Sequence, residues 1–311
     1  MGDYQSFISA VIYSSLLLGP LLGFCIGAYN FPFLAIGYFV WMMNDKAAFR
    51  KGRTSTWFRR SRLWVHFRDY FPCQLIFDNL EELRKHKQLL YASSPHGIIA
   101  TSTHINFGTE ANNISKYLPP ITPVTLSFNF FVPFVREFFM FCGYQSCSQK
   151  TCDYILSRGK SLMIVIGGAQ EVYYINKTHY RLIVKKRKGF FRLAFKYGIP
   201  VVPVFSFGEN SIFTYINSPY LETIQQFVKK HLGFVPPLFH GLKYKSYGWS
   251  FIPHKEPLTT IIGNPIPVEK LQNPTQQDIE QLQQLYIAEL ERIFSKYRNL
   301  YGPCIKQLTV E

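Results

Sequence analysis

The stretch Tyr91-Ala92-Ser93-Ser94-Pro95-His96-Gly97 joins an apolar run to an abrupt turn. The run Leu89–Ala92 has the length and character of a buried strand. Pro95 fixes one backbone torsion and restricts the residue before it, and Gly97 allows a tight turn without a side-chain clash. We therefore expect His96 in a constrained turn at the carboxyl end of a strand.

The position of His96 suits catalysis, because open α/β sheets place their chemistry at the carboxyl ends of strands. Imidazole is also the side chain whose ordinary pKa lies near neutrality, as a general base requires. A lone turn histidine is more often structural. The assignment therefore depends on what the rest of the chain supplies.

The composition indicates contact with lipid and with an anion. Of 311 residues, 47% are hydrophobic and only 17% are charged, which is below the usual quarter. The formal net charge of +15 favours a membrane face, a nucleic acid or a polyanionic small molecule as partner. The six cysteines form no C-x-x-C pair and lack a zinc spacing, which favours free thiols.

The segment from Tyr4 to Asn44 contains no charged residue and no histidine. One continuous helix of this length would span roughly 60 Å, about twice the hydrocarbon thickness of a bilayer. Pro20 and Pro32 interrupt the run. We therefore expect a transmembrane helical hairpin, or one span with a shorter re-entrant piece, rather than a signal peptide.

A basic segment follows the apolar run directly. Positive charge beside a membrane segment marks the cytosolic side and attracts anionic headgroups. The aromatic residues Phe49, Trp57, Phe58 and Trp64 suit the interface region. A nucleic-acid-binding arm is the competing interpretation, and the adjacent apolar run disfavours it. The basic residues are Lys46, Arg50, Lys51, Arg53, Arg59, Arg60, Arg62 and Arg68.

The sequence thus predicts three parts: a membrane-embedded hairpin over residues 1–45, a basic interfacial linker over 46–75, and a cytosol-facing domain over 76–311. In the last part, apolar runs alternate with helical patterns, which indicates βαβ units and a mostly parallel sheet with flanking helices. Strands are expected at Leu89–Ala92, Ile121–Ser127, Leu162–Ile166, Val201–Phe207 and Leu258–Ile262. Helices are expected at Leu80–His86, Phe134–Cys142, Thr151–Ser157, Gly189–Tyr197 and Pro219–His231, with a capped final helix after Thr275.

Polar residues follow two further buried strands. Gly167, Gly168 and Glu171 come after Leu162–Ile166, and the two glycines can expose backbone N–H groups to a phosphate or an oxyanion. Glu209 and Asn210 come after the strand that ends at Phe207. Because parallel strands end at one edge of a sheet, we expect these residues to share a pocket with His96.

The run Lys185-Lys186-Arg187-Lys188-Gly189-Phe190 opens a helical stretch, where cations and helix-start amides can hold phosphate groups. A nuclear localisation signal and plain solvated surface are the alternatives. No dinucleotide-binding or Walker pattern is present, and no G-x-S-x-G elbow supports a serine hydrolase.

Together, these residues resemble the type 2 acyl-CoA:diacylglycerol acyltransferases and their monoacylglycerol and wax-alcohol acyltransferase relatives. The resemblance extends over nearly the whole chain. It is carried by blocks in family order: Phe67-Arg68-Asp69-Tyr70-Phe71-Pro72, Pro95-His96-Gly97, Phe107-Gly108-Thr109-Glu110, Arg136-Glu137, Gly167-Gly168-Ala169 with Glu171, Arg187-Lys188-Gly189-Phe190, Val202-Pro203-Val204 through Glu209-Asn210, and Gly263-Asn264-Pro265-Ile266-Pro267.

The resemblance implies an enzyme of the endoplasmic-reticulum membrane, multi-pass and cytosol-facing, that moves to lipid droplets. It would transfer an acyl group from acyl-CoA, its co-substrate, to the hydroxyl of diacylglycerol or a related neutral lipid. No cofactor, metal or nucleic acid is expected, and assembly into a homo-oligomer stays open. Ser94 is a departure, because animal and fungal members commonly carry a histidine there and plant members do not.

The resemblance assigns His96 as the general base, with Glu110 as the first candidate for the carboxylate that orients its ring and Glu171 and Glu209 as further candidates. The residues expected to bind substrate are Pro95, Gly97, Gly167, Gly168, Glu171, Arg187, Lys188, Gly189, Phe190, Glu209 and Asn210. The alternatives are monoacylglycerol or a long-chain alcohol as acceptor, or a catalytically silent lipid-binding protein of lipid droplets, which Ser94 alone favours.

Overall fold

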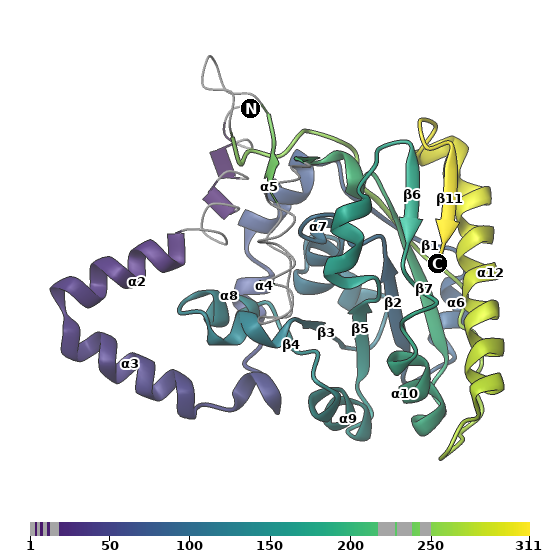
Figure 1. The fold of residues 1–311 in the computed structure, drawn as a ribbon, viewed down its shortest axis with the longest axis horizontal. Coiled ribbons are helices and arrows are strands. Elements are labelled where there is room, and N and C mark those ends of the chain that lie inside the picture. The colour runs from purple at the N-terminus through teal and green to yellow at the C-terminus, as the bar shows by residue number, and fades with distance from the viewer. Residues whose placement is uncertain are drawn as a thin grey trace.

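The computed structural model describes residues 4, 7–8, 11–12, 19–216, 228, 238–242 and 250–311. A seven-stranded sheet with the order β1-β10-β7-β2-β5-β3-β4 forms its centre (Figure 1). Its strands are β1 (Gln74–Phe77), β2 (Leu90–Ser94), β3 (Ile121–Thr125), β4 (Gln145–Ser146), β5 (Ser161–Val165), β7 (Val201–Phe207) and β10 (Thr259–Ile262). Two small sheets pair β6 (His179–Leu182) with β11 (Gln307–Val310), and β8 (Thr214–Tyr215) with β9 (Phe239–His240).

The expectation of a mostly parallel sheet is confirmed. β2 pairs in parallel with β5 and β7, and β3 pairs in parallel with β4 and β5. The exception is β10, which runs antiparallel to β7 and parallel to β1. The carboxyl ends of β2, β5 and β7 therefore lie at one edge of the sheet, where the predicted site residues follow the strands.

Helices and short helical turns connect the strands. The helix predicted at Pro219–His231 falls largely outside the described residues. The helices are α2 (Gly19–Asn30), α3 (Pro32–Asn44), α4 (Thr56–Arg59), α5 (Arg62–Tyr70), α6 (Leu80–Arg84), α7 (Thr101–Thr103), α8 (Val135–Phe141), α9 (Gln149–Ser157), α10 (Gly189–Tyr197) and α12 (Gln276–Tyr301). The short turns are η1 (Ala47–Phe49), η2 (His104–Gly108, π-helical), η3 (Ile114–Lys116), η4 (Ser127–Phe131), η5 (Gly168–Tyr174) and η6 (Glu209–Ser211).

Alternate side chains of the central strands face opposite sides of the sheet, as a pleated strand requires. On β2, Leu90 and Ala92 pack on the side of α9, α10 and α12, whereas Tyr91 packs on the side of α6 and η2. On β5, Leu162 and Met163 divide in the same way. Both faces are apolar, and burial of each large side chain contributes about 1.5–3 kcal/mol.

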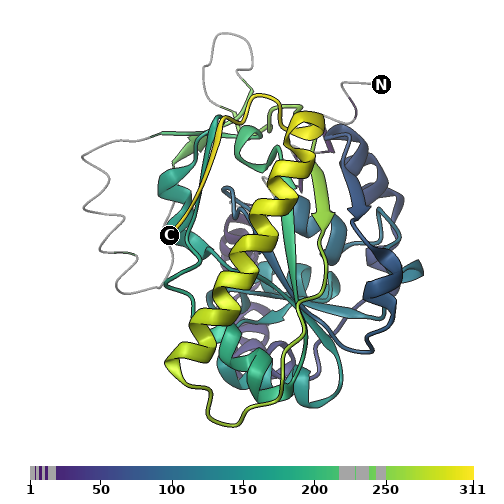
Figure 2. The ribbon, with the colours of Figure 1, turned by 90° about the vertical axis from the view of Figure 1, so that its right-hand side faces the viewer.

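The final helix covers one face of the sheet, as expected. Figure 2 shows α12 lying across the strands. The predicted capping box is present, because the Thr275 side chain accepts from the Asp278 N–H and the Asp278 carboxylate accepts from the Thr275 N–H. The helix buries Ile279, Leu282, Tyr286, Leu290 and Ile293 against the sheet, whereas Leu285 is 57% exposed.

Residues 19–44 of the apolar N-terminal segment form the helices α2 and α3, which project from the body (Figure 1). They meet at Phe31, so the predicted interruption before Pro32 is confirmed. The prediction of a transmembrane helix is not confirmed. α2 has 12 residues and α3 has 13, and within the described ranges no helix has both the length and the hydropathy needed to cross a membrane. A span needs about 20 apolar residues, and the break at Phe31 divides the run.

The aromatic residues of the basic segment have different environments. Trp57 is 82% exposed, as a residue at a membrane interface would be. Trp64 is 1% exposed, because α5 packs it against Phe58, Phe67 and Phe138. The segment after α3 therefore contributes to the core of the domain.

A buried arginine joins α3 to the domain. The Arg136 guanidinium of α8 is 1% exposed and pairs with the carboxylates of Asp45, just after α3, and of Glu137. The Tyr38 hydroxyl of α3 donates to Glu137 Oε2 at 2.6 Å. The Trp41 ring lies 5.1 Å from the Arg136 guanidinium. These contacts fix the direction in which the helix pair leaves the body.

Replacing Arg136 by alanine is expected to lower the free energy of unfolding by roughly 3 kcal/mol, since it leaves Glu137 without its cation and Asp45 with only the more exposed Arg53. Arg53→Ala is the matched control, because Arg53 pairs with the same Asp45 but its side chain is 41% exposed. We expect a loss of less than about 1 kcal/mol for the control. Denaturant unfolding in detergent measures both, and equal losses would contradict a special role for Arg136.

Candidate active site

His96 lies in the turn directly after β2 and is half-buried. Its Nδ1 is 3.0 Å from the carbonyl oxygen of Gly97. A carbonyl oxygen can only accept a hydrogen bond, so Nδ1 carries the proton and Nε2 keeps its lone pair. The turn thus presents an imidazole in the tautomer that a general base needs.

The carboxylate of Glu171 holds the backbone of the histidine. Its Oε2 accepts from the His96 N–H at 2.7 Å, and its Oε1 accepts from the Ile183 N–H at 2.8 Å. Glu171 is only 3% exposed. A Cβ at Gly167 would lie 1.8 Å from the Glu171 carboxyl carbon, so this position must be glycine. The predicted pair Gly167 and Glu171 therefore acts as one unit.

A second buried carboxylate holds the other side of the same turn. Glu209 Oε1 accepts from the Thr101 N–H at 2.7 Å, and Oε2 accepts from the Ser102 N–H at 2.8 Å, at the start of α7. Gly97 has a φ of +58°, and a Cβ there would lie 2.6 Å from Glu209 Cγ. The turn that carries His96 is thus gripped from both sides, as the predicted convergence of strand ends implies.

Burial sets the pKa values in this region. Burial lowers the pKa of His96 below its ordinary value, the hydrogen bond to Gly97 opposes this, and the charge of Arg187 lowers it further. Burial raises the pKa of Glu171 to about 7, against the hydrogen bonds from His96 and Ile183 and the charge of Arg187. Burial also raises the pKa of Glu209.

Arg187 is placed beside the glycine turn. Its Nη2 donates to the Gly167 carbonyl at 2.8 Å and to Gln170 Oε1 at 3.1 Å. Its Nε is buried without a hydrogen-bond partner among the described residues. Buried polar atoms are normally paired, so this N–H is an unused donor. The structure thus brings His96, Glu171 and Arg187 together.

The remaining predicted residues differ in their surroundings. Pro95 is buried in the turn, and Asn210 is buried beside Glu209 with its Oδ1 unpaired within the described ranges. Lys188 is partly exposed, 3.8 Å from Glu280, and Gly189 begins α10 at the surface. Phe190 lies in the hydrophobic core. Its ring is 5% exposed and packs against Phe191 and Tyr286, because α10 turns it toward the core.

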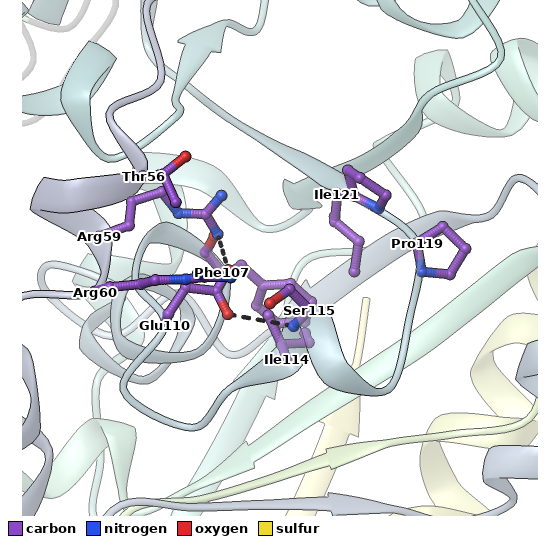
Figure 3. Close-up of a pocket in the computed structure, with 10 residues that line it drawn as sticks. Thr56, Arg59, Arg60, Phe107, Glu110, Ile114, Ser115, Pro119 and Ile121 are labelled. Carbon is purple, nitrogen blue, oxygen red and sulfur yellow. Dashed lines mark hydrogen bonds and ion pairs between the residues drawn. The ribbon is translucent and has the colours of Figure 1, made fainter.

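Glu110 does not reach the histidine. Its carboxylate pairs with Arg59 at 3.2 Å and accepts from the Ser115 N–H at 3.3 Å (Figure 3). Because β2 and β3 are parallel, the connection between them must return along the sheet before β3 begins. Glu110 lies after that return, in a cavity of about 250 Å³ beside Ile121. The Gly97 carbonyl, rather than this carboxylate, fixes the ring of His96.

Two residues of α12 support the site and were not assigned there from the sequence. The Tyr286 hydroxyl donates to the Ala92 carbonyl at 3.2 Å. Gln283 Nε2 donates to the carbonyls of Val184 and Lys185 at 3.1 Å, which holds the loop before Arg187. The available signal was spacing, since Gln283 lies four residues after Ile279 and shares the buried face of the helix.

Ser94 is fully buried on the face of β2 that packs against α12, where its hydroxyl adjoins that of Tyr286. Its side chain therefore faces α12. Among the described residues, no three His, Cys, Asp or Glu side chains come together as metal ligands would.

A tight turn with a histidine of lowered pKa, at the carboxyl ends of parallel strands and beside an arginine, defines the candidate site of an α/β enzyme. Sequence comparison specifies the class further. The family described as diacylglycerol acyltransferase matches residues 25–311. Diacylglycerol O-acyltransferase 2 from Xenopus tropicalis is 37% identical over 279 residues, which cover 86% of this chain and 77% of that protein. The same enzyme from Dictyostelium discoideum is 38% identical, over 86% of this chain and 82% of that one.

A further relative has a different name. The 2-acylglycerol O-acyltransferase 1 of Bos taurus is 34% identical over 304 residues, covering 95% of this chain and 90% of that protein. A solved structure, the 1-acyl-sn-glycerophosphate acyltransferase of Thermotoga maritima, aligns over 95% of this chain with a TM-score of 0.47 and 11% identity. On the sequence matches, this chain belongs to the diacylglycerol acyltransferase family.

Gly167→Ala is expected to push the Glu171 carboxylate away from the His96 and Ile183 N–H groups, because the new Cβ occupies its place. The free energy of unfolding should fall by about 1–3 kcal/mol, and amide hydrogen exchange at His96 should accelerate. Gly37→Ala is the control, since nothing lies within 4 Å of a Cβ there. Unchanged exchange at His96 in Gly167→Ala would show that the carboxylate does not hold the turn.

Proposed function

We propose that this protein esterifies the free hydroxyl of diacylglycerol with the acyl group of acyl-CoA, and that His96 is the general base. Family membership supports the reaction. The observation that supports the role of His96 is its tautomer: Nδ1 is committed to the Gly97 carbonyl, and Nε2 keeps the lone pair. The lowered pKa keeps the ring neutral at physiological pH.

In this mechanism, His96 Nε2 accepts the proton of the acceptor hydroxyl while the hydroxyl oxygen attacks the thioester carbonyl carbon. The tetrahedral intermediate then collapses, the carbon–sulfur bond breaks, and the imidazolium returns the proton to the leaving thiolate. General-base assistance of this kind contributes about 10²–10⁴ in rate. Glu171 and Glu209 act as positioning residues, because they bind the backbone of the turn and not the ring.

Backbone N–H groups and Arg187 would stabilise the negative charge that develops. The amides of Gly97 and Gly168 belong to the two turns at this edge of the sheet and are our candidates for the oxyanion contact. Arg187 is close enough to lower the pKa of His96, so its charge also acts on the reacting atoms. Its unpaired Nε–H gives it a donor for a ligand oxygen.

The basic run around Arg187 suits the phosphate groups of coenzyme A. Lys185 and Lys186 are exposed, and Lys188 is partly exposed, so their ammonium groups are available to an anion. The loop is held in place, because the N–H groups of Val184 and Lys185 both donate to the Glu311 carbonyl at 2.6 Å. A fixed loop of cations loses little entropy when it binds a polyanion.

We place the helix pair α2 and α3 in a lipid surface, with the domain apposed to it on the cytosolic side of the endoplasmic reticulum or on lipid droplets. Both helices expose large apolar side chains, with Tyr29 88% and Phe33 87% exposed. Short apolar helices can enter a bilayer without crossing it. This position would bring the site close to the phase in which the acceptor and the acyl chain dissolve.

Monoacylglycerol is the second candidate acceptor. The observation in its favour is the relative named 2-acylglycerol O-acyltransferase 1, which matches 95% of this chain. Both acceptors present a hydroxyl on a glycerol carbon, so the same base serves either. Long-chain alcohols are a third acceptor to be tested alongside them.

His96→Ala is expected to lower triacylglycerol synthesis by at least about 100-fold, because the general base is lost. The assay uses microsomes from a host without neutral-lipid synthesis, labelled oleoyl-CoA, and diacylglycerol, monoacylglycerol or hexadecanol. The preferred acceptor of the native chain identifies the activity. His86→Ala is the matched control, since His86 lies before β2, at the other end of the strand. Membrane-bound native protein that acylates no acceptor would leave the silent lipid-binding alternative in place.

Arg187→Gln is expected to move the acid limb of the pH–rate profile to higher pH. The charge of Arg187 lowers the pKa of both His96 and Glu171, so its removal raises both, and the neutral base is lost earlier as pH falls. Arg187→Lys keeps the positive charge, so the acid limb of this variant should lie close to its position in the native protein. Lys186→Gln makes the same charge change at an exposed neighbour and should leave the limb in place.

The KM values of Arg187→Gln test the phosphate contact separately. We expect the KM for acyl-CoA to rise more than the KM for diacylglycerol, because only the thioester substrate carries phosphate. Equal increases for both substrates would remove the phosphate-binding role and leave the electrostatic effect on His96.

A further inference from the structure

A second concave site lies at the base of α3, formed by two segments that are far apart in the sequence. It has a volume of about 470 Å³ and is lined by Lys46, Ala47, Arg50, Lys51, Gly52, Arg53, Tyr154 and Arg158. The first six follow α3 directly, and the last two come from the end of α9. The basic character of the first segment is evident from the sequence, but its proximity to Arg158 is not.

The two segments are joined by a hydrogen bond from a side chain to the backbone. The Phe49 carbonyl accepts from the Thr151 hydroxyl of α9 at 3.3 Å. Within the loop, the N–H groups of Arg50 and Gly52 both donate to the Ala47 carbonyl, at 3.1 and 2.8 Å. This compact turn groups the basic side chains at one side of α9. The site is therefore built by the fold and is not a chance cluster on a flexible tail.

Most of the positive charge in this site is uncompensated. Arg53 pairs with Asp45 at 2.8 Å, but no ion pair involves Lys46, Arg50, Lys51 or Arg158 within the described part of the chain. The nearby carboxylate of Asp153 is turned toward α10, where it accepts from Lys196 at 2.7 Å. The Arg158 guanidinium lies 5.4 Å from the Tyr154 ring, which limits its orientation.

We propose that this site binds the phosphate group of an anionic phospholipid. Several cations without partners in one concavity favour a compact, multiply charged anion, and phosphate accepts hydrogen bonds from arginine and lysine. The site continues directly from α3, whose exposed residues Phe33, Leu34 and Ile36 are apolar. When α3 lies in the lipid, Lys46 and Arg50 stand at headgroup depth, where anionic phosphate is concentrated.

The inference rests on the proposed position of α2 and α3 in the lipid surface, but not on the acyl transfer reaction. Contact between the apolar helices and lipid does not distinguish one phospholipid from another. A phosphate site would make the interaction specific for anionic phospholipids. Arg158 distinguishes phosphate binding from insertion of the helix pair in lipid. It is the residue that follows α9, and it belongs to neither the helix pair nor the basic loop.

The test measures binding of the full-length chain to phosphatidylcholine vesicles, with and without a minority of phosphatidic acid, by flotation. We expect phosphatidic acid to strengthen binding of the native protein. Arg158→Ala should reduce that gain about fivefold, since a basic residue near an anionic surface contributes about 1 kcal/mol. Arg192→Ala is the matched control, because it removes one exposed arginine from α10. Thermal unfolding verifies that each variant is folded.

The outcomes separate the failures. If the native protein binds neither kind of vesicle, the placement of α2 and α3 in lipid is wrong, and this inference is wrong with it. Binding that does not respond to phosphatidic acid, or equal losses in Arg158→Ala and Arg192→Ala, would overturn the phosphate site alone. A second arm adds inorganic phosphate to the protein in neutral detergent, with chloride at equal ionic strength. Stabilisation there that Arg158→Ala abolishes, without a phosphatidic acid effect, would assign the site to free phosphate and overturn the lipid assignment.

Discussion

The carboxylate of Glu171 is the contact on which the candidate site depends most. Burying a carboxylate is costly unless its oxygens are filled by hydrogen bonds. Here each oxygen accepts from a different segment, His96 after β2 and Ile183 after β6. The cost of desolvation is thereby offset only in part, since the pKa of Glu171 is still raised to about 7, and two connections of the sheet are joined at the histidine. Gly167 exists to leave room for this carboxylate.

The site is supported from behind by the final helix. α12 begins with a capping box at Thr275. Its Tyr286 hydroxyl donates to the Ala92 carbonyl of β2, and its Gln283 side chain donates to the loop that leads to Arg187. The turn that carries His96 and the basic loop are therefore supported by the same helix. Their relative positions are set by a helix that lies nearly 200 residues further along the chain from His96.

The sequence predicted the parts of the fold that carry long, regular patterns. The strand β7 and the helix α10 have the predicted bounds, because their apolar patterns are uninterrupted. β2 was predicted at Leu89–Ala92 but spans Leu90–Ser94, since the two serines read as turn formers continue the strand. β1 and β4 were not predicted, because β1 exposes Gln74 and buries none of its residues fully, and β4 has only two residues, too few for a periodic pattern. The antiparallel pairing of β10 with β7 was not predicted either, since it depends on contacts between distant segments.

The same distinction applies to the site. The strand ends that hold His96, Glu171 and Glu209 were predicted to converge, and parallel topology brings them to one edge. Which carboxylate acts on which group could not be predicted. Glu110 is close to His96 in sequence, but the crossover carries it to the start of β3. The partners of Glu171 are backbone N–H groups, which no side-chain pattern reveals.

The buried pairing of Arg136 with Asp45 also bears on the shape of the surface that the enzyme works on. Because α3 is joined to α8 through ionised and aromatic groups, the helix pair cannot swing freely against the domain. With α2 and α3 placed in a lipid surface as proposed, a fixed angle between the helix pair and the body suits one local curvature better than another. On a small, strongly curved droplet the lipid surface bends away from the body, whereas a flat membrane stays beneath it. The junction would thus make the rate of acyl transfer depend on droplet radius.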